Sequence, residues 1–207
     1  YKQQLATAGA SSIIAVFLAL ILWSESVSPP LLIGWLASML VVQITRLTLR
    51  VLFFRSPPPI EAAPRWERLA VATTAAAGIG WGSSVLLFFD PAAPINLVVT
   101  TMTATGVAAG GLAVLSALPA AYFAYLFMHI PPLIFLLAVA GSVISVFFAA
   151  SFVFFMIVLV SSARAIGAMI KESLRLRFER IGMIEQDRKS TRLNSSHVSE
   201  FRMPSSA

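Results

Sequence analysis

The sequence predicts an all-α, polytopic membrane protein with six transmembrane helices and a cytoplasmic helical extension. Hydrophobic residues make up 58% of the chain, charged residues 12%, and the mean hydropathy is +0.86. Soluble domains average about 45–50% apolar and about 25% charged residues. Six apolar stretches lie between Leu5 and Ser162, each close to the roughly 20 helical residues that cross a hydrocarbon core of about 30 Å. The stretches from Ile13 to Trp23 and from Val143 to Val160 have no polar face, which disfavours a soluble helical bundle. All six stretches are continuously apolar without a strand-like alternation, which disfavours a β-barrel.

Turn-forming residues separate the six stretches and set the bounds of each predicted span. In chain order the breakers are Ser28-Pro29-Pro30, Pro57-Pro58-Pro59 with Pro64, Asp90-Pro91 with Pro94, Pro119 and Gly141. The predicted spans are Leu5–Trp23, Leu31–Leu49, Leu69–Phe89, Ile95–Leu115, Ala120–Ala140 and Ser142–Ser162. The last two connections are short, which favours helical hairpins. Residues 1–162 are therefore predicted to form one membrane domain.

The distribution of basic residues predicts the orientation of the domain. Cationic side chains gather at the N-terminus, at the second loop and after the sixth span: Lys2, Arg46, Arg50, Arg55, Arg65, Arg68, Arg164 and Lys171. The opposite loops carry only Glu25 and Asp90. The positive-inside rule then places both termini in the cytoplasm, as an even number of spans requires. The positive charge indicates topology and a lipid bilayer as partner, and does not indicate nucleic-acid binding.

Two arginines in the second span are candidates for ligand contact or sensing within the membrane. Arg46 and Arg50 stand four residues apart on one helical face, with Gln43 one turn earlier. The three side chains form a polar stripe suited to a pore or an anionic ligand. The simpler interpretation, which we favour from sequence, is that both arginines lie near the cytoplasmic end and extend to the interface.

His129 is the third candidate, in the fifth span. One histidine supplies one metal ligand, and the chain has no cysteine, so no metal or haem site is predicted. We expect instead a buried hydrogen bond from His129 to a neighbouring helix. Pro131-Pro132 is expected to kink this span and to free carbonyl groups.

Small residues recur at helix-packing spacing in the third and fourth spans. Gly78 and Gly82 form one pair and Gly106 and Gly110 another, and both predict a close approach of helix backbones. The alternative use of the fourth span is a ligand cleft lined by its threonines, which are Thr100, Thr101, Thr103 and Thr105.

Catalytic signatures are absent from the sequence between Tyr1 and Gln186. It has no glycine-rich phosphate loop, nucleophile motif, paired intramembrane carboxylates or metal-ligand cluster. We therefore predict no catalytic, cofactor-binding or metal-binding residues in this segment.

Residues 163–186 predict a cytoplasmic signalling helix that continues the sixth span. The segment is charged and amphipathic, and no proline separates it from the span. An apolar stripe at a/d-type positions, interrupted by Arg177, predicts a coiled coil, with a helix lying on the membrane surface as the alternative. The stripe consists of Ile170, Leu174, Ile181 and Ile184.

The same segment carries a family resemblance. The run Glu172–Arg180, ESLRLRFER, followed by Ile184-Glu185-Gln186, resembles the junction in bacterial sensor histidine kinases, often hybrids with a receiver domain, between a multi-span membrane region and a coiled coil. The usual form there is close to SLRLRFEN followed by LxEEL, so Arg180 replaces the usual Asn and Gln186 ends the match. The resemblance covers about fifteen residues, and the six-span layout before them is also similar.

The resemblance implies a sensory region in the bacterial inner membrane whose full-length protein dimerises. That protein would autophosphorylate on a cytoplasmic histidine with ATP and Mg²⁺ and pass the phosphate to a response regulator or receiver domain. The kinase core is not part of this sequence, so the segment itself is expected to be inactive. Some membrane-anchored diguanylate cyclases and phosphodiesterases carry similar input regions and remain an alternative. Two further alternatives remain. One is a small transporter or channel with Arg46, Arg50 and His129 along its path, and the other is a purely structural membrane anchor.

The last residues differ in character from the rest of the chain. Asp187–Ala207 reads DRKSTRLNSSHVSEFRMPSSA, which resembles a translated sequencing adapter with a variable index between two constant parts. We interpret residues 187–207 as an artefactual, disordered tail and expect the natural sequence to diverge after about Gln186.

Overall fold

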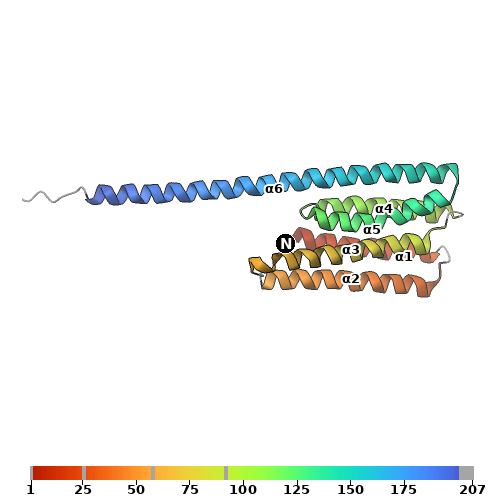
Figure 1. The fold of residues 1–207 in the computed structure, drawn as a ribbon. Coiled ribbons are helices and arrows are strands. Elements are labelled where there is room, and N and C mark those ends of the chain that lie inside the picture. Colours follow the sequence, from red (N-terminus) through yellow and green to blue (C-terminus); the bar gives the residue numbers. More distant parts are fainter. Residues whose placement is uncertain (1, 25–26, 57–58, 91–92, 201–207) are drawn as a thin grey trace, which may run out of the picture. The chain divides into compact units, whose positions relative to one another are not determined.

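The computed structural model describes residues 2–24, 27–56, 59–90 and 93–200, apart from the side chains of residues 2–10, 24, 94 and 185–200. Within these residues the chain is helical and contains no strand. The elements are α1 (Lys2–Ser24), α2 (Pro29–Arg55), the short 3₁₀ helix η1 (Ile60–Ala62), α3 (Ala63–Phe88), α4 (Pro94–Leu115), α5 (Pro119–Val139) and α6 (Val143–Glu200). Figure 1 shows α1 to α5 lying side by side with roughly parallel axes.

The predicted breakers mark the ends of these helices. Pro29, Pro94 and Pro119 each stand at the first position of a helix, where the missing N–H has no intrahelical partner to lose. Gly141, between α5 and α6, has a φ of +70°, which a residue with a Cβ rarely adopts. The all-helical prediction is confirmed, and α2, α3 and α6 extend beyond the predicted spans to Arg55, back to Ala63 and on to Glu200.

Five of the helices are long and apolar enough to cross a membrane: α2, η1 with α3, α4, α5 and α6. Many of their large apolar side chains are exposed, among them Met102, Phe135 and Phe154 at 71%, 63% and 69%. Exposed apolar surface on this scale fits a lipid environment, because soluble monomers rarely show it. The first predicted span stays a prediction: the described apolar part of α1, Ser11–Trp23, is shorter, and residues 5–10 lie outside the described side chains.

The chain forms two units, Tyr1–Ala165 and Ile166–Ala207. In the first unit α6 buries one stripe, formed by Ala149, Phe152, Leu159 and Ala163, while Phe147 and Phe154 are exposed at 68% and 69%. The a/d-like spacing of the stripe is typical of helices packed along one seam. The second unit contains the charged continuation of α6, including an ion pair from Arg175 Nε to Glu179 Oε1 at 2.9 Å.

Residues 187–200 differ from the expectation of a disordered tail, because α6 includes them as helix through Glu200. The run from Asp187 to Glu200 contains neither proline nor glycine, so no residue in it breaks the helix. Residues 201–207 lie outside the described part of the chain.

The closest helix packing in the first unit is between α3 and α5. A Cβ on Gly78 would fall on the carbonyl oxygen of Tyr125, and a Cβ on Gly82 on that of Met128. Pro132 deprives the Met128 carbonyl of its usual helical donor, and this carbonyl, left without a helical partner, faces the Cα of Gly82. Contacts of the Cα–H···O kind recur at such helix interfaces. The close approach predicted for Gly78 and Gly82 is thus confirmed.

Candidate functional site

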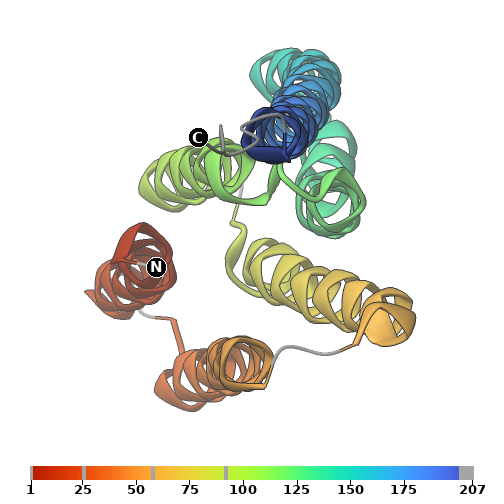
Figure 2. The same cartoon turned by 90° about the vertical axis from the view of Figure 1, so that its left-hand side faces the viewer.

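A cavity of about 910 Å³ lies within the first unit. Residues from α1, α2, η1, α3 and α4 line it, together with Tyr125 of α5. Figure 2, which looks along the helices, shows α1, α2, α3 and α4 grouped around a common centre, and residues of all four line the cavity. Most lining side chains are apolar, and the volume falls within the range of roughly 300–1,000 Å³ common for small-molecule sites.

The wall supplied by α2 carries the predicted polar stripe. Gln43, Arg46 and Arg50 all line the cavity, because positions three and four residues apart share one helical face. An Nη1 of Arg46 donates a hydrogen bond to Oε1 of Gln43 at 3.3 Å. The guanidinium of Arg50 lies 5.8 Å from the centre of the Phe54 ring. Both arginines are half-buried, which is the placement that contact with a ligand requires.

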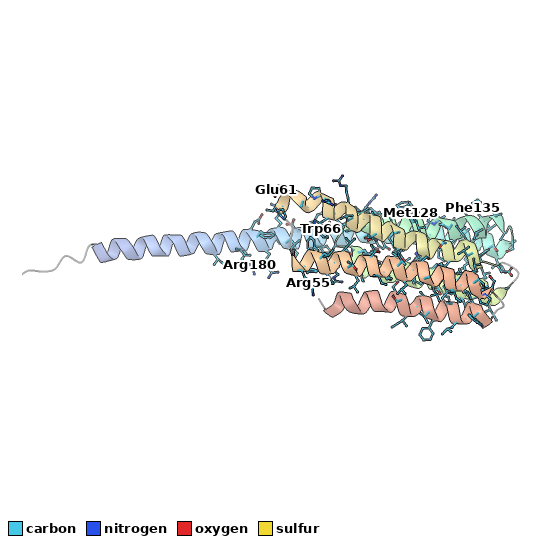
Figure 3. All side chains as sticks on the ribbon, turned by 90° about the horizontal axis from the view of Figure 1, so that it is seen from below. Arg55, Glu61, Trp66, Met128, Phe135 and Arg180 are labelled. Atoms are coloured by element: carbon cyan, nitrogen blue, oxygen red, sulfur yellow. The ribbon has the colours of Figure 1, made fainter. Side chains whose placement is uncertain are left out.

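The α3 wall is mixed in character. Thr73 and Thr74 line the cavity, but their hydroxyls donate to the carbonyls of Leu69 and Ala70 at 2.9 and 2.7 Å. Glu67 also lines it and is exposed. Trp66 packs edge-on against Phe53 at 5.4 Å, so an aromatic pair lies at the end of the cavity near the start of α3. Figure 3 shows Arg55, Glu61 and Trp66 at this end of the unit and Phe135 toward the opposite one.

The α4 wall corrects one prediction. Gly106 and Gly110 line the cavity, and among the described residues a Cβ on either would meet nothing within 4 Å. The close approach expected of this pair is therefore wrong: the glycines leave space rather than admit a neighbouring helix. The four threonines of α4 do not line the cavity, and Thr101 and Thr105 donate to their own helix at Leu97 and Thr101, at 2.7 and 2.8 Å.

Aromatic side chains form the inner wall and connect four helices. Trp81 and Tyr125 line the cavity. Trp81 packs edge-on against Trp35 of α2 at 5.8 Å, and the indole N–H of Trp35 donates to the carbonyl of Gly80 at 2.8 Å. Tyr122, next to Tyr125, donates its hydroxyl to the carbonyl of Ala108 in α4 at 3.1 Å. Packing and hydrogen bonds thus link the inner wall to α2, α3, α4 and α5.

His129 lies directly behind this inner wall. Its ring centre is 5.4 Å from that of Tyr125 and 6.3 Å from that of Trp81, and the side chain is completely buried. Within the described residues neither ring nitrogen has a hydrogen-bond partner. The expected hydrogen bond to a neighbouring helix is therefore wrong, and the imidazole packs instead against the rings of Trp81 and Tyr125.

Replacing His129 with Leu is expected to leave the free energy of unfolding unchanged or to raise it by up to about 2 kcal/mol. Two unpartnered polar atoms are costly to bury, and an apolar side chain of similar size removes that cost. The measurement is unfolding of the detergent-solubilised chain with increasing sodium dodecyl sulfate, followed by circular dichroism. A loss above about 1 kcal/mol, on the scale of a typical hydrogen bond, would show that His129 has a polar partner.

The remaining predicted residues lie on the charged part of α6. Leu174, Ile181 and Ile184 are exposed at 48%, 52% and 56%, and Ile170 is half-buried. Among the described residues no group of three His, Asp or Glu side chains is placed to hold a metal ion.

The structure thus brings Arg46 and Arg50 into one cavity wall and His129 behind another. Sequence reasoning missed Trp81 and Tyr125 as parts of this site. Its only local signal was the concentration of aromatic residues before Pro131, and this concentration does not reveal which helix they face. Comparisons with models of protein families, with curated proteins and with solved structures find no match to this chain.

Proposed function

We propose that the chain is the membrane-embedded input region of a two-component sensor histidine kinase. In this proposal it transmits a signal through α6 to a cytoplasmic kinase core that uses ATP and Mg²⁺. The observation that carries the proposal is the continuity of α6 (Val143–Glu200) from the apolar sixth span through the charged residues 163–186. The helix therefore continues without a break from the apolar sixth span into the charged segment that resembles the kinase junction.

The apolar stripe on α6 supports a homodimeric form of this protein. Leu174, Ile181 and Ile184 are each about half exposed in the single chain, and their spacing matches the a/d seam of a coiled coil. In the proposed mechanism a change in packing among the helices of the first unit shifts or rotates α6, and the two-state output domain responds. A response regulator or receiver domain accepts the phosphate.

A Gly-Pro insertion after Ile170 is expected to abolish regulated autophosphorylation of the full-length protein in membrane vesicles. Proline removes a helical hydrogen bond and breaks the continuity on which transmission depends. The matched control duplicates residues 170–176. This insertion adds one heptad and keeps both the helix and the register of the stripe, so it is expected to retain regulation. Unchanged regulation in the Gly-Pro variant would contradict the proposed transmission.

The alternatives differ in what they require of the same structure. A diguanylate cyclase or phosphodiesterase would keep the input region and change only the output domain, which sequencing the gene across the codon for Gln186 identifies directly. A transporter path along Arg46, Arg50 and His129 requires His129 to reach the cavity, whereas His129 is completely buried and does not line it.

A further inference from the structure

The cavity in the first unit combines positive charge with a long apolar wall. Its lining on α3 extends from Ala63 to Trp81, which is about 27 Å along the axis at about 1.5 Å per residue. The cavity is therefore elongated along the bundle. A compact solute would contact only part of a wall of this length.

The cationic groups lie partway along the cavity. Phe53 of α2 contacts Trp66 of α3, and Trp35 of α2 contacts Gly80 of α3, so these two pairs fix the antiparallel register of the helices. Arg46 and Arg50 lie between the two levels. Beyond them the cavity is lined by Ala77, Trp81 and Tyr125, and by a glycine face of α4 that consists of Gly106, Gly110 and Gly111.

Two features of the wall indicate that the ligand carries a polar, anionic group. Arg46 has five N–H donors, and the structure gives it one hydrogen bond, to the side chain of Gln43. Tyr125 is only 4% exposed, and its hydroxyl has no hydrogen-bond partner within the described residues. A buried hydroxyl such as that of Tyr125 is costly unless it is paired. Two cationic side chains and one carboxylate, the exposed Glu67, line the cavity, so its charged lining favours an anion.

We propose that this cavity binds an amphiphile with a carboxylate or phosphate head group on an acyl chain. The head group binds to the guanidinium groups of Arg46 and Arg50, which match such oxyanions in geometry. The chain lies along Ala77, Trp81 and the glycine face of α4. The inference rests on the proposed sensory function only in making this amphiphile the stimulus, because the binding site itself is independent of the output domain.

Binding is measured on the whole 207-residue chain in nanodiscs of phosphatidylcholine. The probe is dansylated undecanoic acid, detected by energy transfer from tryptophan, with empty nanodiscs as the correction for partition into lipid. Competitors are hexadecanoate, hexadecanol, hexadecyltrimethylammonium, phosphatidylglycerol and inorganic phosphate. Hexadecanoate is expected to displace the probe, and hexadecanol and hexadecyltrimethylammonium are not. Displacement by phosphatidylglycerol as well assigns the site to a bilayer lipid, and its failure assigns the site to a single-chain amphiphile.

Two variants, each with a matched control, test the residues. Arg46→Gln is expected to raise the Kd of the probe about tenfold or more, the effect of losing a charged hydrogen bond. Its control is Arg55→Gln, on the same helix but exposed and outside the cavity lining. Gly110→Leu fills the cavity and is expected to weaken binding at least tenfold. Its control is Gly34→Leu, where a Cβ also meets nothing within 4 Å but the residue does not line the cavity.

The assigned ligand would be overturned by any of three results. Hexadecanol could displace the probe as well as hexadecanoate does, or inorganic phosphate alone could displace it. The third is that Arg46→Gln and Gly110→Leu leave the Kd of the probe unchanged. Binding that leaves autophosphorylation of the full-length protein unchanged would instead overturn the sensory role and keep the site. Absence of binding, together with the expected loss of regulation after the Gly-Pro insertion, would overturn the ligand and keep the proposed function.

Discussion

Trp81→Ala is expected to lower the free energy of unfolding by about 3 kcal/mol, the low end of the range for truncating a buried tryptophan. The side chain is 2% exposed and packs against Trp35 of α2 and His129 of α5. Its loss therefore removes contacts that connect three helices. The low end applies because lipid is as apolar as the protein interior, so lost packing rather than transfer from water dominates the cost.

The measurement is again unfolding in mixed micelles with increasing sodium dodecyl sulfate, followed by circular dichroism. Trp23→Ala is the control, because Trp23 is 55% exposed and its removal is expected to change the free energy of unfolding by less than about 0.5 kcal/mol. Equal effects of the two substitutions would show that the inner wall is not part of the stable core.

Gly78→Ala is expected to destabilise the first unit by about 1–3 kcal/mol, the usual cost of adding a methyl group to a tightly packed site. The new Cβ would fall on the carbonyl oxygen of Tyr125 and would also lie 3.0 Å from the Cα of that residue. Both are backbone atoms of α5, so they cannot rotate away as the end of a side chain would. The two helices must separate, which also weakens the contact at Gly82. The same unfolding assay measures the effect.

Gly106→Ala is the matched control for Gly78→Ala. Gly106 also begins a Gly-x-x-x-Gly pattern, but a Cβ there meets no described atom within 4 Å. The free energy of unfolding is expected to stay unchanged or to rise slightly, since alanine is the better helix former. Equal destabilisation by the two substitutions would show that the spacing of the glycines matters rather than their partner.

These glycines illustrate what the sequence can predict here. The helices and their bounds follow from local signals, namely long apolar runs and breakers such as Pro29, Pro119 and Gly141. The two glycine pairs have the same spacing, yet one lies against a backbone and the other lines a cavity. The difference depends on which helix faces each pair, and nothing near the glycines in the sequence encodes it.

The candidate site shows the same limit. The common face of Gln43, Arg46 and Arg50 follows from helical periodicity alone. The cavity that they line requires the placement of α1, α3 and α4, which no local pattern specifies. The sequence predicts a buried His129 with a hydrogen bond, and only its burial is confirmed. One neighbouring ring, Tyr125, stands one turn earlier on the same helix, but the other, Trp81, is far from His129 in the sequence and on another helix.

The glycine contacts between α3 and α5 also imply that stability is unevenly distributed within the first unit. The pair α3 and α5 is held backbone against backbone, whereas among the described residues α1 contacts only α2 and α4 closely, and α1, α2 and α4 line the cavity. Local opening is least costly where few atoms are in contact. The α3–α5 pair is therefore expected to be the last part of the first unit to open.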